Sequence, residues 1–189
     1  MGSIEIRDGP LGLLGDALHI PLAAGFSTRN ILYNGGHVDL IADTGTALLL
    51  YRFVNAPTQY ADLGLGFRPW GFTVNVNLHP GLLPGAASNQ AASWVDPILG
   101  GRYHVDFPAG FLGSLPSGFG FSAYGDVGGF DLGAHTDWQV IGTIDYAPNS
   151  WLNLQLGYRS LNFDYTASRF ALGFNVHMRG PILAATIKF

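Results

Sequence analysis

The sequence of 189 residues contains no cysteine, so it offers neither a disulfide framework nor a thiolate metal site. Charge is also scarce. Asp, Glu, Lys and Arg together supply 12% of the residues, about half of the roughly 25% that is usual for soluble domains. The net charge of −4 provides no basic patch, so we expect no nucleic-acid partner.

A long uninterrupted hydrophobic run is absent as well. A membrane helix requires about 18 or more consecutive apolar residues. The nearest candidate, residues 9–26, is interrupted by Asp16, Pro10 and Pro21, and no basic segment precedes it. We therefore expect neither a membrane helix nor a signal peptide. Because hydrophobic residues still make up 48% of the chain, two fold classes remain: a soluble β-protein with a large core, and a transmembrane β-barrel.

Hydrophobic residues alternate with polar or small ones over much of the chain. The clearest stretches are "FTVNVNLH" (72–79), "TDWQVIGTIDY" (136–146) and "SWLNLQLGYR" (150–159). Successive side chains of a strand point to opposite faces, so each stretch has one apolar and one polar face. The polar faces hold mainly Gly, Ser, Thr and Asn with isolated Asp and Arg, a composition typical of a barrel lumen. The sequence thus predicts an all-β, closed antiparallel transmembrane β-barrel, with residues 1–189 as a single domain.

The number of strands follows from the alternating segments and the turn signals between them. Two short sequences, "RPWG" (68–71) and "APNS" (147–150), indicate tight turns. We expect ten strands, an even number that places both termini on one side, although eight or twelve remain possible. The expected strands are 3–8, 17–26, 37–53, 60–68, 71–79, 94–105, 118–129, 136–146, 151–164 and 170–189.

Aromatic residues cluster beside the expected tight turns. Trp70 and Trp151 flank these turns, and Tyr146 would lie at the same end of the barrel. Aromatic girdles of this kind mark the bilayer interface of transmembrane barrels. The alternative is that aromatic residues are common at strand ends in all β-proteins.

Charged residues on the polar faces are the main candidates for function. Unpaired charges in a narrow lumen are costly, so acidic and basic side chains should pair or be hydrated. They would form either a structural network that fills the barrel or a constriction that selects small solutes or ions by charge. The residues assigned to this lumen network are Asp96, Arg102, Asp126, Asp145, Arg159 and Lys188.

Evidence for catalysis or metal binding is weak. His135 and Asp137 have a spacing that would place both on one face of a strand at the barrel rim, as in a membrane-embedded hydrolase. The alternative is a polar loop residue beside a lumen residue. No G-x-S-x-G sequence is present, and the six histidines show no metal-binding spacing. We therefore expect no enzyme activity, no catalytic residues, no cofactor and no metal.

The C-terminal half contains five sequence blocks in order: "WVDPILGGRY" (94–103), "GDVGGF" (125–130), "TDWQVIGTIDY" (136–146), "WLNLQLGYRSLNFDY" (151–165) and "GFNVHMRGPILAATIKF" (173–189). Together these blocks resemble a family of Gram-negative outer-membrane β-barrel proteins, and the resemblance fades before Trp94. It implies a bacterial outer membrane as location, and a last strand whose terminal aromatic pattern is read by the barrel-assembly machinery. Leu183, Ala185, Ile187 and Phe189 would then face lipid.

These observations predict a small membrane barrel that is either a passive pore for small solutes or ions or a barrel with a plugged lumen. A structural or engineered barrel scaffold without transport is one alternative. A hydrolase acting at the rim near His135 and Asp137 is another. The expected partners are the lipid bilayer, the barrel-assembly machinery and, for a pore, small solutes or ions.

Overall fold

The computed structural model describes residues 2–27, 32–110, 117–166 and 173–188, and the regular structure of these residues is β-strand. In this part of the chain, no helix is long and apolar enough to cross a membrane. The strands are β1 (Gly2–Asp8), β2 (Leu11–Phe26), β3 (Tyr33–Ala56), β4 (Gln59–Pro80), β5 (Ala86–Asp106), β6 (Phe119–Gly129), β7 (Thr136–Tyr146), β8 (Leu152–Thr166) and β9 (Gly173–Ile187).

All nine strands belong to one sheet in which each strand pairs antiparallel with the next along the chain. The prediction of an all-β antiparallel fold is confirmed. The expected strands 60–68 and 71–79 are one strand, β4, because the sheet continues through the predicted turn. Arg68 pairs with Asp96 of β5, and Trp70 pairs with Thr44 of β3. Pairing on both sides outweighs the turn preference of Pro69 and Gly71.

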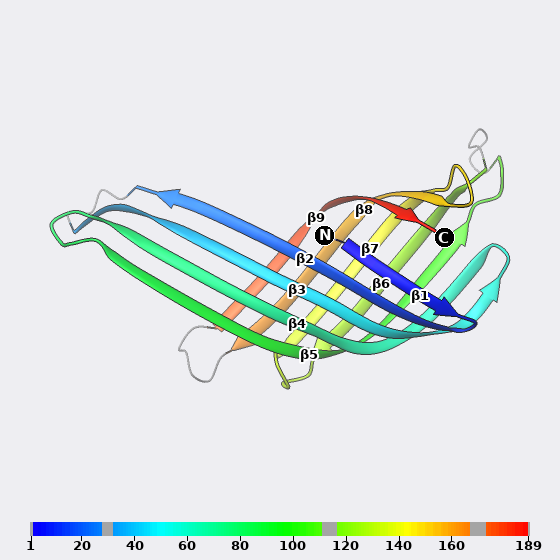
Figure 1. Cartoon of the computed structure of the whole chain (residues 1–189), viewed down its shortest axis with the longest axis horizontal. Coiled ribbons are helices and arrows are strands. Elements are labelled where there is room, and N and C mark those ends of the chain that lie inside the picture. Colours follow the sequence, from blue (N-terminus) through cyan, green and yellow to red (C-terminus); the bar gives the residue numbers. More distant parts are fainter. Residues whose placement is uncertain (1, 28–31, 111–116, 167–172, 189) are drawn as a thin grey trace.

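An odd number of strands changes the placement of the chain ends. Strand directions alternate, so β1 and β9 run in the same direction, and the expectation of ten strands with both termini on one side is wrong for the described residues. The strands also differ in length, since β3, β4 and β5 have 24, 22 and 21 residues while β6 and β7 have 11 each. As Figure 1 shows, the ends of β2–β5 therefore project beyond β6–β9.

The sheet is strongly curled, so that the early strands face the late strands (Figure 1). Side chains meet across the inner face. The ring centroids of Trp70 on β4 and Phe163 on β8 lie 4.4 Å apart, and Asp16 on β2 lies 3.6 Å from Arg159 on β8. Among the described residues, no pairing joins β1 to β9. The inside of the curl is therefore filled with side chains, and β1 and β9 form the two edges of the sheet.

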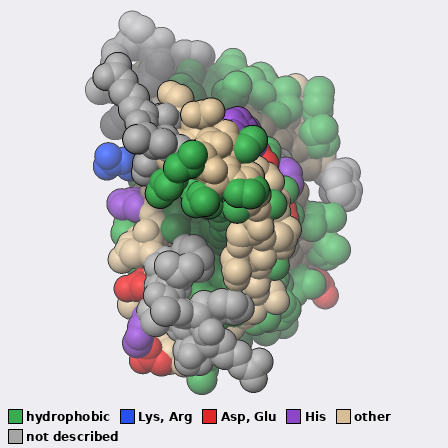
Figure 2. All heavy atoms as spheres, turned by 90° about the vertical axis from the view of Figure 1, so that its left-hand side faces the viewer, with side chains coloured by type: hydrophobic (Ala, Val, Ile, Leu, Met, Phe, Trp, Pro, Cys, Tyr) green, Lys and Arg blue, Asp and Glu red, His purple; other side chains and the backbone are tan. Residues whose placement is uncertain are grey.

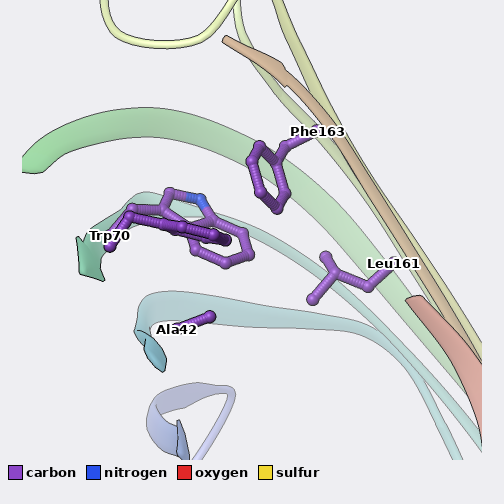
Figure 3. Packing of buried hydrophobic residues seen from close by; sticks show 5 residues of the cluster. Ala42, Trp70, Leu161 and Phe163 are labelled. Carbon is purple, nitrogen blue, oxygen red and sulfur yellow. The ribbon is translucent and has the colours of Figure 1, made fainter. Parts of the chain in front are cut away.

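A hydrophobic cluster occupies the inner face where the long strands begin to extend past the short ones. Trp70 is 3% exposed and packs with Ala42, Leu161 and Phe163, as seen in Figure 3. The prediction that Trp70 belongs to an interface girdle is therefore wrong, because the strand continues through this position and turns the indole inward. Trp151, just before β8, is exposed, and Tyr146 at the end of β7 is half-buried.

The outer face divides into an apolar and a polar part along the longer strands. On β4, Leu63, Leu65 and Phe67 are exposed on the outer face, and Asn75 and Asn77 follow on the same face further along. The strands β3, β8 and β9 show the same change of character, whereas the outer faces of β6 and β7 carry only apolar or small residues. Exposed apolar side chains on their outer faces include Leu13, Leu49, Tyr51, Leu99, Val127, Val140, Ile144, Leu154, Leu156, Leu183 and Ile187. We call this continuous surface the apolar band.

The inner face changes its character along the strands as well. Behind the apolar band it carries buried charges, among them Asp62, Arg68 and Asp126, beside a small buried apolar cluster that includes Leu48 and Ile98. Where the outer face becomes polar, the inner face carries the Trp70–Phe163 cluster and further apolar side chains. A strand such as β4 thus reverses its inside and outside polarity at about Trp70.

Candidate functional site: charged clusters inside the sheet

Arg68 lies at the centre of the most deeply buried group of charges. Its guanidinium is completely buried and donates to both carboxylate oxygens of Asp126 on β6, at 3.0 and 2.6 Å. It also donates to Asp137 on β7 at 2.6 Å and to the hydroxyl of Thr46 at 3.2 Å. A planar guanidinium with five donors suits this forked arrangement. Arg68 therefore joins β4 to β6 and β7 across the inside of the curl.

Two aromatic side chains complete this Arg68 cluster. The indole nitrogen of Trp70 donates to the second oxygen of Asp137 at 3.0 Å, and the hydroxyl of Tyr124 donates to Asp126 at 2.5 Å. Buried polar groups are costly unless they are hydrogen-bonded. Here each carboxylate accepts from more than one donor, which is the condition under which buried charges are tolerated. The indole of Trp70 also connects the Arg68 cluster to the hydrophobic cluster beyond it.

A second group, the Asp62 cluster, lies nearer the end of the sheet where β3 turns into β4. The side chain of Asp62 is fully buried and accepts hydrogen bonds from Arg7, Arg52 and Arg102. Arg102 also donates to both carboxylate oxygens of Glu5 on β1, at 2.7 and 3.0 Å. Three arginines surround two carboxylates, so one positive charge is in excess. The guanidinium carbon of Arg52 lies 3.9 Å from the centroid of the Tyr60 ring, where cation–π attraction stabilises it.

The third group is built around Asp145 on β7. This buried carboxylate accepts hydrogen bonds from the side chains of Thr143, Gln155 and Ser122. His104 lies beside it, with Nδ1 3.2 Å from Asp145 and Nε2 3.1 Å from Asp106. The Asp145 cluster therefore links β5, β6, β7 and β8 on the inner face.

Ser122 and His104 invite comparison with a catalytic serine, because His104 Nδ1 lies 2.8 Å from the Ser122 hydroxyl. The hydroxyl, however, donates to Asp145 rather than to His104. A histidine with a carboxylate beside each ring nitrogen is held as a donor on both sides, whereas a general base must present a free lone pair. The arrangement supports a structural link rather than an activated nucleophile.

The structure places most of the residues assigned to the lumen network on the inner face. Asp126 belongs to the Arg68 cluster, Arg102 to the Asp62 cluster, and Asp145 to its own cluster. Asp96 is fully buried and accepts from the Trp94 indole nitrogen and the backbone N–H of Ala134.

Two further members of the predicted network differ from these. Arg159 is buried and lies 3.6 Å from Asp16 across the curl. Lys188 is exposed and directly follows the end of β9, where its backbone N–H donates to the Trp151 carbonyl at 2.8 Å, and its assignment to the inner network stays a prediction.

The residues proposed as an assembly signal occupy the outer face of β9. Leu183 and Ile187 are exposed, and Ala185 lies between them on the same face. Thr186 points inward and donates to Gln155 at 3.3 Å. Phe189, the fourth residue of the predicted signal, lies outside the described residues.

The predicted lumen network did not include Arg68, the central arginine of the inner face. Arg68 was expected as the last residue of strand 60–68, on its polar face, and also as the first residue of the turn 68–71, so it was not expected inside a long strand. Extending the alternation of 63–67 through to 72–78 would have placed Arg68 and Trp70 on the inner face. Glu5 and Arg7 were missed because a seven-residue strand gives a short periodic signal.

The proposed rim pair is not brought together. His135 lies before the start of β7, is exposed, and contacts the side chain of Asp131. Asp137 is 1% exposed and is bound by Arg68 and Trp70. The expectation that both share one face of a strand is therefore wrong, because β7 begins between them. Within the described residues, no group of three or more His, Asp or Glu side chains could hold a metal ion.

Comparison with known proteins adds no further constraint. No family model, curated protein or solved structure matches this chain. The resemblance of the C-terminal half to Gram-negative outer-membrane barrels therefore stays a prediction, and the function is argued from the two faces of the sheet alone.

Proposed function

We propose that this protein is a β-barrel of a bacterial outer membrane whose interior is closed by paired charges and a hydrophobic plug. It would act as a membrane-embedded structural barrel rather than as an open pore. The observation that carries this proposal is the combination of an apolar outer band with an inner face behind it whose buried charges form hydrogen-bonded clusters. A soluble β-protein would require the reverse arrangement at this level.

The height of the apolar band supports a membrane location. On β4 the outer face is apolar from Ala61 to Pro69 and becomes polar from Thr73. Nine residues of strand measure about 30 Å, and a tilt of about 40° reduces this to about 23 Å across the membrane. The outer band of known transmembrane barrels is about 25 Å tall. The band thus has the dimension that a bilayer requires.

The edges of the sheet support closure at the same level. β1 pairs with Leu11–Ala17 of β2, the part of β2 that lies in the apolar band. Beyond Ala17, the outer face of β2 begins with the exposed His19. An unpaired strand edge is not tolerated in hydrocarbon but is tolerated in water. We therefore propose that β1 closes against β9 within the band, as a parallel pair.

The burial of the inner side chains supports the proposal of a closed interior. The side chains of Arg68, Asp126 and Asp137 are fully buried, and the indole and phenyl rings of Trp70 and Phe163 pack above them. An ion crossing the barrel would have to break the Arg68 cluster and then pass an apolar layer. Both steps are costly.

Recording current through a planar bilayer tests this function. Purified protein is refolded, inserted, and checked for insertion by co-flotation with vesicles and by its β-sheet circular dichroism. We expect inserted wild-type protein to show no unitary conductance. A steady unitary conductance would contradict the closed interior and favour the second candidate, a charge-selective pore. In that case Arg102→Ala should change the ratio of cation to anion permeability.

A further inference from the structure

A second inner surface, beyond the hydrophobic cluster, is not used by the proposed function. It lies on the parts of β2–β5 that project past β6–β9 (Figure 1). Its side chains come from successive inner rows of the four strands, in which Leu22 pairs with Leu40, and Leu40 with Val74. We call this surface the apolar vestibule, and its main residues are Leu22, Phe26, Leu40, Val74, Val76 and Leu78.

The side chains of the vestibule share one face of the sheet. A Cβ built on Gly36 would lie 2.8 Å from the Phe26 ring and 3.2 Å from Leu78, so these two side chains converge over the glycine. Leu40 packs directly against the Trp70–Phe163 cluster, which continues the same inner face. The vestibule is therefore an upward extension of the hydrophobic core, not a separate patch.

Part of this surface has no cover among the described residues. Side chains of β8 and β9, among them Phe163 and Val176, belong to or pack against the hydrophobic cluster that Leu40 also contacts. Above them, Leu22 is 56% exposed and Phe26 is 42% exposed. Figure 2 looks onto this end of the molecule and shows hydrophobic side chains bordering a recess.

Membrane lipid is an unsuitable cover, because the outer face at this level is polar. Asn75 and Asn77 on β4 lie on the strand face opposite Val74 and Val76, and Asn75 is hydrogen-bonded to Asn89 of β5 at 2.5 Å. A sheet that is polar outside and apolar inside belongs in water or among headgroups, with its inner face covered from within. The occupant must therefore enter the recess.

The chemistry of the lining identifies the class of occupant. Among the described inner residues above the Trp70–Trp94 row, none is charged, and Gln90 and Ser88 on β5 supply the polar atoms. The floor is aromatic, with the Trp94 and Tyr165 rings stacked at 3.9 Å. Concave, mostly apolar sites with few polar groups bind small apolar molecules. We propose that the vestibule binds an uncharged apolar small molecule, and that the aromatic floor keeps it apart from the Arg68 cluster.

Fluorescence quenching can detect such a ligand. The chain has four tryptophans, of which Trp70 and Trp94 lie on the inner face, whereas Trp138 and Trp151 do not. A Trp138→Phe/Trp151→Phe background in lipid nanodiscs leaves the inner pair as the emitters. Titration with 1-bromododecane, a neutral heavy-atom quencher, should give saturable quenching. Quencher dissolved in the bilayer is separated from these indoles by the sheet.

Two variants of neighbouring residues locate the site. Val76→Arg places a charge in the vestibule and should raise the half-saturating concentration by roughly tenfold or more. Asn77→Arg places the same charge on the outer face and should leave it unchanged. Val76→Thr keeps the side-chain shape and should raise the half-saturating concentration by a smaller factor. This variant tests the site even if the arginine variant misfolds.

Three results would overturn the inference. Absence of quenching would show that no apolar molecule reaches the floor. Linear quenching that Val76→Arg and Val76→Thr leave unchanged would show partition into lipid only. Quenching by a brominated fatty acid but not by 1-bromododecane would show that the ligand is an anion rather than a neutral molecule.

Discussion

Arg68 and Asp62 present opposite solutions to burying charge. One guanidinium is shared by Asp126 and Asp137 in the Arg68 cluster, whereas the Asp62 carboxylate is shared by three arginines. Removing a shared central ion leaves its partners uncompensated, while removing one of several partners leaves the centre still paired. The two clusters should therefore respond differently to the loss of one arginine.

Replacing Arg68 by methionine should destabilise the protein by about 3–5 kcal/mol, because it strands two buried carboxylates. Arg52→Met should cost much less, since Arg7 and Arg102 still bind Asp62. Urea unfolding in lipid vesicles, followed by tryptophan fluorescence, measures both. Equal losses would contradict the central role of Arg68. In an Arg68→Met background, neutralising the carboxylates with Asp126→Asn and Asp137→Asn should recover part of the stability.

The two tryptophans assigned to an interface girdle should also differ. Trp70→Ala removes a core indole and its hydrogen bond to Asp137, so we expect a loss of about 3–5 kcal/mol. Trp151 is 51% exposed, so Trp151→Ala should cost distinctly less. Thermal unfolding of the two variants in the same detergent provides the comparison. A larger effect of Trp151→Ala would restore the girdle interpretation for Trp70.

At the level of single strands, alternation was a reliable guide where no turn signal interrupted it. The expected segment 136–146 coincides with β7, and 37–53 lies within β3. The turn predicted at 68–71 was wrong, because pairing of these residues with both β3 and β5 outweighs their local turn preference. The residues of β3 and β5 that stabilise the strand here lie far away in the sequence, so the local sequence does not predict it.

Close approach of β7 and β8 gives a prediction for a matched pair of glycines. A Cβ at Gly157 on β8 would overlap the carbonyl oxygen of Gly142, whereas a Cβ at Gly142 would meet only a Phe121 ring carbon at 4.0 Å. Gly157→Ala should therefore destabilise by about 1–3 kcal/mol, because the strands must move apart. Gly142→Ala should change the free energy of unfolding by less than about 0.5 kcal/mol. Chemical denaturation of both variants in the same lipid system measures the two free energies of unfolding. Equal losses of stability would contradict the close approach of β7 and β8 at Gly157.

For the whole molecule, the sequence indicated which face would carry charge but not which charges would meet. Asp96, Asp126 and Asp145 were expected on the polar faces, and they lie on the inner face. The partners of Arg68 are 58 and 69 residues away, so their contacts depend on how far the sheet curls. That curl arises from the summed twist of nine strands, and a local sequence pattern does not predict this sum.

Closure of the curl can be tested by cross-linking, since the chain has no cysteine of its own. If β1 and β9 pair within the apolar band, Ile4 or Ile6 must lie beside Leu183 or Ala185 on the outer face. Double cysteine variants of these four combinations, oxidised in vesicles, should give at least one disulfide, which requires Cβ atoms about 3.5–4.5 Å apart. Ile4→Cys/Val140→Cys, with β8 and β9 between the two sites, serves as the negative control. A set without any disulfide would mean that the edges stay apart.

The polarity reversal along β4 gives the sharpest test of membrane insertion. Leu65 is 64% exposed in the middle of the apolar band, and Asn77 is exposed beyond it on the same face of the same strand. In water, an arginine at either position would be harmless, because both sites are solvent-accessible. In a bilayer, Leu65→Arg should cost about 2–4 kcal/mol, while Asn77→Arg should cost about 0–1 kcal/mol.

Unfolding both variants in phospholipid vesicles measures the difference. Two equally small costs would mean that the band does not contact hydrocarbon, and the barrel would then have to be a soluble one. A large cost at Leu65 alone identifies lipid as the solvent of the outer face, because the site offers an arginine no steric conflict and no ionic partner to lose. The difference in stability between Leu65→Arg and Asn77→Arg therefore measures the cost of placing a charge in hydrocarbon, because neither substitution disturbs the packing of the inner face.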